Sequence, residues 1–72
     1  MKATADMYTY RVFWSGEDGA FVASVSEFPS LSNVADSQKE ALDGLSELVA
    51  DILADMRESG EQPPVPLGCR TY

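Results

Sequence analysis

Residues 37–59 read SQKEALDGLSELVADILADMRES, and this segment has the longest and clearest periodic pattern in the chain. Its apolar residues recur at spacings of three and four, which places them on one stripe of a 3.6-residue helix. They are Ala41, Leu42, Leu45, Leu48, Val49, Ile52, Leu53 and Met56. Ser37 and Glu40 have the spacing of a capping box, and Gly60 suits the left-handed residue that ends a helix. The sequence therefore predicts one long helix over residues 37–59.

The segment before this helix has the alternation of strands. Residues 7–15 alternate between a face predicted to join the core and a second, partly solvated face. The first face holds Tyr8, Tyr10, Val12 and Trp14, and the second holds Met7, Thr9, Arg11 and Phe13. An Asp-Gly turn leads to a returning strand over residues 20–26, and Pro29 interrupts the pattern before a third strand over residues 31–35. The first two strands are predicted to form an antiparallel hairpin.

The order of these segments predicts a single α+β domain over residues 1–72. It has two layers, a three-stranded antiparallel sheet and one long helix that covers one face of the sheet. The proline-rich tail, residues 60–72, is expected to be extended. Residues 67–72 form either a short closing strand or a frayed end. A domain this small is marginally stable alone, so self-association as a dimer or tetramer is expected.

The composition restricts the function. Twelve Asp and Glu residues against five Lys and Arg residues give a net charge of −7, which disfavours direct binding to nucleic acids and favours a basic protein partner. The chain has no histidine, which excludes Ser-His-Asp and Cys-His sites and removes the commonest nitrogen ligand of zinc. We expect that the protein is not an enzyme. We also expect no catalytic residue, no bound metal and no cofactor. Neither a signal peptide nor a membrane span is recognisable, which predicts a cytoplasmic protein that does not bind membranes.

The helix carries a row of acids at i, i+4 spacing, which we call the acid row: Asp43, Glu47, Asp51 and Asp55. By helical geometry it lies opposite the apolar stripe, and its like charges destabilise the helix by about 0.2–0.5 kcal/mol per pair. Two interpretations remain open. The row is either a docking and steering surface for a basic partner or an ordinary solvated face.

Three short segments resemble one known family. They are the hairpin GEDGAFVA at residues 16–23, the Glu27-Phe28-Pro29 break, and the helix entry ADSQKEA at residues 35–41. Together they are similar to the HicB-like antitoxins in order and spacing. Ala35 stands where that family often has Gly, Ser37 where it often has Thr, and Ser30-Leu31 where it often has Gly-Cys.

The resemblance implies a partial RNase H-like fold and a role in masking a small basic mRNA-cleaving toxin of the HicA type. We expect no DNA-binding extension of the kind that many family members carry. RNase H catalysis itself needs carboxylates on the sheet, and the predicted strands carry none. The alternative function is a stand-alone, self-associating regulatory or structural module without a toxin partner.

The predicted partner-binding residues fall into two groups. Asp18, Glu27 and Phe28 lie at the loop ends of the predicted sheet, and Asp43, Glu47 and Asp51 lie in the acid row. A further candidate surface is the face of the sheet that the helix leaves open, where some of Thr9, Arg11, Phe13 and Val22 are expected. The free edge of the sheet is another.

Overall fold

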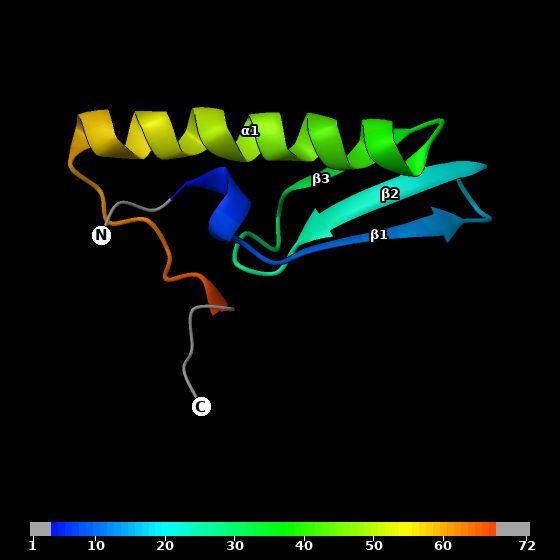
Figure 1. Ribbon diagram of the computed structural model, residues 1–72, viewed down its shortest axis with the longest axis horizontal. Helices are drawn as coiled ribbons and strands as arrows, with labels where there is room; N and C mark the ends of the chain where they lie inside the picture. The colour runs from blue at the N-terminus through cyan, green and yellow to red at the C-terminus, as the bar shows by residue number, and fades with distance from the viewer. Residues whose placement is uncertain (1–3, 68–72) are drawn as a thin grey trace.

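The computed structural model of the chain describes residues 4–67. Its elements are η1 (Ala5–Met7, a 3-10 turn), β1 (Tyr10–Ser15), β2 (Ala20–Val25), β3 (Ser32–Ala35) and α1 (Gln38–Ser59). The three strands form one antiparallel sheet in the order β1-β2-β3, and α1 packs on one side of it (Figure 1). The predicted α+β fold with a three-stranded antiparallel sheet and one long helix is therefore confirmed.

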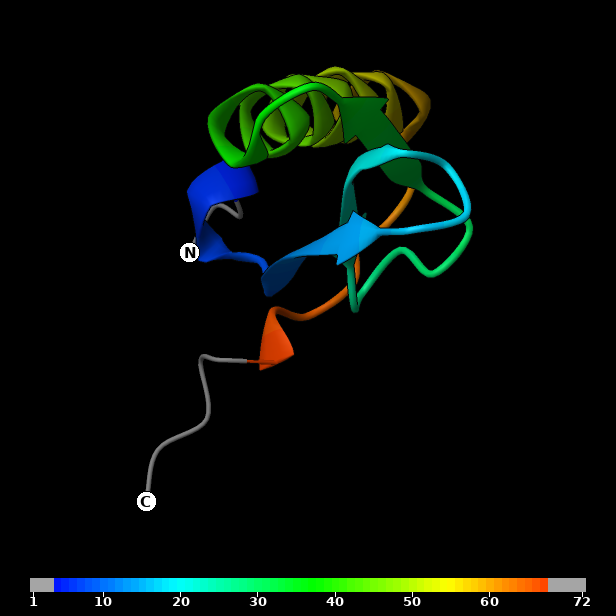
Figure 2. The ribbon, with the colours of Figure 1, turned by 90° about the vertical axis from the view of Figure 1, so that its right-hand side faces the viewer.

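The register of the sheet divides its side chains between two faces. Val12 lies opposite Ala23, and Ala23 lies opposite Asn33, so these residues share the face toward α1. Phe13 lies opposite Val22, and these residues share the other face, which we call the open face. Viewed end-on, α1 covers only one face of the sheet (Figure 2).

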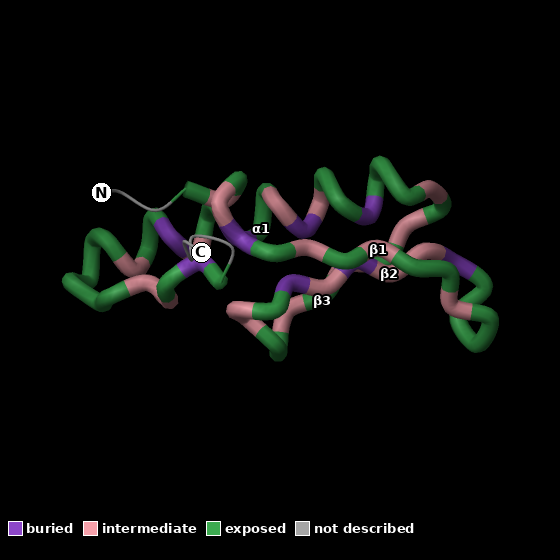
Figure 3. Tube along the Cα trace, turned by 60° about the horizontal axis from the view of Figure 1, so that its bottom comes forward, coloured by how far each residue is buried: buried purple, intermediate pink, exposed green. Residues whose placement is uncertain are grey.

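The core lies between α1 and the sheet. On α1 it uses every fourth residue, so that a single stripe of the helix is buried (Figure 3). The buried apolar residues that form this cluster are Tyr8, Ala23, Val25, Ala41, Leu45, Val49 and Leu53. α1 extends beyond the strands, and there η1 packs against it (Figure 1). The Tyr8 hydroxyl donates a hydrogen bond to the Pro64 carbonyl at 2.7 Å, which ties the tail to the same end of the molecule.

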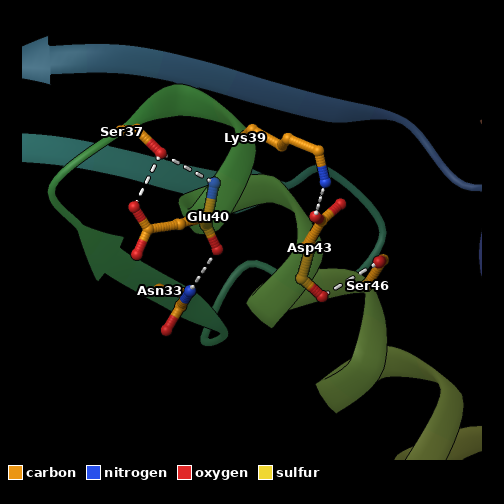
Figure 4. Close-up of polar contacts among 6 residues, drawn as sticks. All are labelled: Asn33, Ser37, Lys39, Glu40, Asp43 and Ser46. Atoms are coloured by element: carbon orange, nitrogen blue, oxygen red, sulfur yellow. Dashed lines mark hydrogen bonds and ion pairs between the residues drawn. The ribbon is translucent and has the colours of Figure 1, made fainter.

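Both ends of α1 follow the prediction. The Ser37 hydroxyl accepts a hydrogen bond from the Glu40 backbone N–H at 3.1 Å and donates to the Glu40 carboxylate at 3.0 Å (Figure 4). At the other end Gly60 has φ of 79°, the left-handed conformation that favours glycine, and Arg57 lies in the last turn. These caps satisfy backbone groups that the helix itself leaves without partners.

A close contact fixes α1 against β3. The Asn33 side-chain amide donates to the Ala41 carbonyl at 3.1 Å and to the Glu40 carbonyl at 3.5 Å. Gly44 lies beside this amide, and a Cβ atom at Gly44 would clash with it. The close packing against Asn33 therefore explains why a glycine occupies position 44 in the middle of the helix.

Two details of the predicted first strand were wrong. β1 begins at Tyr10 rather than Met7, because Ala5–Met7 closes a local 3-10 turn and the Thr9 N–H bonds the Glu27 carboxylate. Trp14 is not in the core, because it lies on an edge strand next to the hairpin turn, and 58% of it is exposed. Its ring packs edge-on against Phe21 at 5.1 Å.

The ends of the other strands differ from the prediction by one residue. β2 ends at Val25 rather than residue 26, and β3 begins at Ser32 because the Leu31 N–H closes a turn onto the Phe28 carbonyl. Residues 68–72, which make up most of the segment considered for a closing strand, lie outside the described residues. No helix within residues 4–67 is long and apolar enough to cross a membrane.

Candidate partner-binding surfaces

The acid row lies on the side of α1 that faces away from the sheet. Asp43, Glu47, Asp51 and Asp55 are all exposed, whereas the buried stripe of the helix points to the core. Consecutive carboxylates in the row are displaced by about 6 Å along the helix axis, since four residues rise 1.5 Å each. The row is thus a linear series of negative charges open to solvent.

One end of this row is partly neutralised within the chain. The Lys39 ammonium forms an ion pair with the Asp43 carboxylate at 2.7 Å, one helical turn away (Figure 4). The hydrogen bond and the charge of Asp43 raise the pKa of Lys39, so the lysine keeps its proton. The unbalanced charge of the row is therefore centred on Glu47, Asp51 and Asp55 rather than on Asp43.

Glu27 holds three segments of the chain together. One carboxylate oxygen accepts from the Thr9 N–H at 2.9 Å, and the other accepts from the Thr9 hydroxyl at 3.0 Å and from the Leu67 N–H at 2.8 Å. Desolvation acts to raise the pKa of Glu27, but the hydrogen bonds from Leu67, from Thr9 and from its own backbone N–H lower it overall. Both oxygens of this predicted contact residue are engaged inside the molecule. Its evident role is to fasten the tail and the start of β1 to the loop after β2.

Phe28 and Asp18 lie at different ends of the sheet. Phe28 is half-buried and packs edge-on against Tyr8, with ring centroids 5.4 Å apart. Asp18 is exposed in the turn between β1 and β2, where its carboxylate accepts from the Ser15 hydroxyl at 3.0 Å. The β1–β2 register places this turn at the opposite end of the hairpin from Glu27. The six predicted contact residues therefore form three separate groups and not one patch.

The open face of the sheet carries a row of apolar side chains. Phe13, Val22 and Val34 lie side by side across the three strands, and Phe13 and Val34 are 41% and 52% exposed. The Arg11 guanidinium lies over the Phe13 ring, 5.6 Å from its centroid. Arg11, Phe13 and Val22 were predicted candidates for this face, whereas Val34 was missed. The alternation within residues 31–35 is the signal that would have identified it.

Within residues 4–67 no group of three Asp, Glu, His or Cys side chains is close enough together to hold a metal ion. Comparisons of the chain with protein-family models, with curated proteins and with solved structures gave no match. The candidate surfaces must therefore be interpreted from their own geometry and charge.

Proposed function

We propose that this chain is an antitoxin-like binding protein that masks a small basic RNase of the HicA type. The observation that supports the proposal most directly is the acid row, which is exposed along the outer side of α1 in a chain of net charge −7. Within this proposal the protein has no enzymatic activity of its own and acts in the cytoplasm, where an mRNA-cleaving toxin works. The sheet and helix would correspond to the partial RNase H-like fold of that family.

The proposed mechanism is electrostatic. An RNase that binds RNA must present cationic groups to phosphates, and these groups also attract a line of carboxylates. Complementary charge raises the rate of encounter and orients the partner before close contacts form. A carboxylate series bound across the toxin's RNA site would exclude the RNA phosphates and so block cleavage without any chemical step.

The energetics of α1 agree with a partner-binding role for the acid row. Its three i, i+4 steps cost about 1 kcal/mol in total as like-charge repulsion, and the Lys39 ion pair offsets part of this at the first position only. A basic partner would relieve the repulsion that remains at Glu47, Asp51 and Asp55. The same surface thus weakens the free protein slightly and strengthens the complex.

The test compares two double charge reversals with the same net charge. Glu47→Lys with Asp51→Lys removes the centre of the acid row, and Glu17→Lys with Glu61→Lys changes two exposed acids outside it. Each pair moves the net charge from −7 to −3, because each reversal adds two units. Stopped-flow association with a purified HicA-type toxin is measured over a series of salt concentrations.

We expect the acid-row variant to lose about tenfold or more in association rate at low salt, with the difference shrinking as salt screens the charges. The control pair should lose clearly less. Equal losses in both variants would show that only net charge matters and would remove the role of the row. The absence of any complex between the wild-type protein and the toxin at low salt would reject the antitoxin proposal itself.

A further inference from the structure

The free edge of β1 is a second candidate interaction surface. β1 is an outer strand of the sheet, with β2 on one side only among the described residues. The Ser26 N–H donates to the Thr9 carbonyl, which lies directly opposite it in the extended register. Because the direction of backbone groups alternates along an antiparallel strand, Tyr10, Val12 and Trp14 point their N–H and C=O groups to the outer edge. This edge is a template for a further strand.

The edge of β1 has little of the usual protection against strand pairing, since its one charged residue, Arg11, lies over the Phe13 ring. Edge strands are normally shielded by proline, lysine or inward charges, by bulges or by short length. β1 has six residues, YRVFWS, without Pro, Lys, Asp or Glu, and it pairs with β2 in a continuous register. The opposite edge differs, since β3 has four residues and runs directly into the cap of α1. Strand addition therefore favours the β1 edge.

Side chains on both faces of β1 are exposed, and a strand added at this edge would cover them. Phe13 points to the open face and is 41% exposed, whereas its neighbour Trp14 points to the helix side and is 58% exposed. A strand laid along β1 places its own side chains next to both aromatic residues, one on each face. Packing on the open face alone would cover Phe13 but leave Trp14 exposed.

We propose that β1 pairs with β1 of a second copy of this chain, antiparallel and about a two-fold axis, to give a continuous six-stranded sheet. The charge distribution selects this occupant. β1 carries Arg11 and no acid, so the paired strands themselves bring no carboxylate together, although each chain has a net charge of −7. A basic partner is instead attracted to the acid row on α1, away from the β1 edge. A two-fold pairing is also self-complementary, because each copy contributes the same edge.

The faces of the sheet restrict the register of this pairing. Apolar side chains stay on matching faces only if residues of the same face lie opposite each other. A pairing centred on Val12 meets this condition. It places Arg11 opposite Phe13 of the second copy and Tyr10 opposite Trp14 of the second copy, so the cation-π contact already present within β1 is repeated across the axis. An interface of one short strand per copy is small, and we expect a weak dimer that depends on concentration.

The first test measures mass against concentration by sedimentation velocity. The mass should rise from 7.8 kDa toward twice that value, 15.6 kDa, as the protein is concentrated.

Two substitutions at Trp14 test the edge of β1. Trp14→Pro removes an outward N–H without removing a β1–β2 bond, and Trp14→Lys places a lysine at the edge. Both should weaken dimerisation at least tenfold. Val34→Lys, on β3 at the other side of the open face, is the matched control and should leave it unchanged. Helical circular dichroism verifies that each variant is folded.

Amide hydrogen exchange provides a readout of the edge itself. The amides of Tyr10, Val12 and Trp14 should exchange rapidly in dilute solution and slow down as the dimer forms, while those of Arg11 and Phe13 stay protected throughout. Four results would overturn the proposal: a mass of 7.8 kDa at every concentration, dimerisation lost in Val34→Lys but kept in Trp14→Pro, no concentration dependence at the three edge amides, or protection of those amides in the monomer. None of these measurements involves a toxin, so the dimer and the antitoxin proposal succeed or fail separately.

Discussion

Replacing Glu27 by Gln tests whether one carboxylate fastens the tail to the sheet. The wild-type carboxylate accepts three hydrogen bonds, two from Thr9 and one from the Leu67 N–H. Glutamine has one acceptor oxygen, and its NH2 group is turned toward a donor. One of the three bonds is therefore lost, and the other two lose the assistance of a charged acceptor.

The size of the effect follows from this count. Glu27 is only half-buried, so solvent weakens each bond, and we take about 1 kcal/mol for a bond to the carboxylate and about half of that for a bond to the amide. The loss in the free energy of unfolding is then about 2 kcal/mol. A domain of this size loses roughly 4–8 °C in Tm per kcal/mol, which gives a fall of about 8–16 °C. Glu61→Gln, at an exposed acid of the same tail, is the control and should change stability by less than about 0.5 kcal/mol.

The pH dependence of stability distinguishes the contribution of the charged Glu27 carboxylate from that of the packing of its side chain. The pKa of Glu27 is lowered in the folded protein, so its stabilisation is complete above the unfolded value of roughly 4.3 and is lost as the pH falls through the folded value. Urea unfolding followed by circular dichroism should show the full difference at pH 7, and the difference between wild type and Glu27→Gln should shrink as the pH falls through the lowered folded pKa of Glu27. Equal stability at pH 7, or a difference that persists undiminished at low pH, would refute the role of the charged carboxylate.

Two further predictions concern α1. Gly44→Ala should give less than the gain of about 1 kcal/mol expected inside a helix, because its Cβ displaces the Asn33 amide, and in an Asn33→Ala background the gain should be complete; a double-mutant cycle by urea unfolding that shows strict additivity would contradict this. Gly60→Ala should cost about 1–2 kcal/mol, because its φ of 79° is unfavourable for alanine, whereas Gly16→Ala, which meets no neighbouring atom, should be neutral or slightly stabilising. Similar Tm values for the two alanine variants would count against the strain at the helix end.

Local sequence signals predicted α1 and the acid row well, because both depend on helical geometry alone. The Ser37 cap, the Gly60 end and the 3.6-residue period each act within a few residues, and the exposure of Glu47 follows from the same period. The hairpin was predictable for the same reason, since alternation and an Asp-Gly turn fixed it. These elements could be identified without knowledge of any tertiary contact.

The role of Glu27 and the exposure of Trp14 could not be predicted, because both depend on contacts between distant segments. Glu27 reaches Thr9 over 18 positions and Leu67 over 40, and no spacing rule links a carboxylate to such partners. The Thr9 N–H also bonds this carboxylate, and together with the 3-10 turn Ala5–Met7 this makes β1 begin at Tyr10, whereas periodicity predicted residue 7. The alternation also placed Trp14 on the core face correctly, but it could not show that α1 leaves the end of an edge strand uncovered. Alternation along a strand predicts which face of the sheet a side chain occupies. Whether that side chain is buried depends on which other segments pack over it.

The two proposed interfaces lie on different sides of the protein and are compatible with each other. The acid row faces away from the sheet on α1, and the β1 edge continues the plane of the sheet. In a dimer formed through β1 the two-fold axis is perpendicular to the sheet, so both helices lie on the same face and both acid rows stay exposed. One dimer can therefore present two equivalent acidic surfaces to two basic partners. Binding a cation-rich partner also lowers the charge repulsion between the two copies, and by thermodynamic reciprocity dimerisation must strengthen partner binding to the same extent.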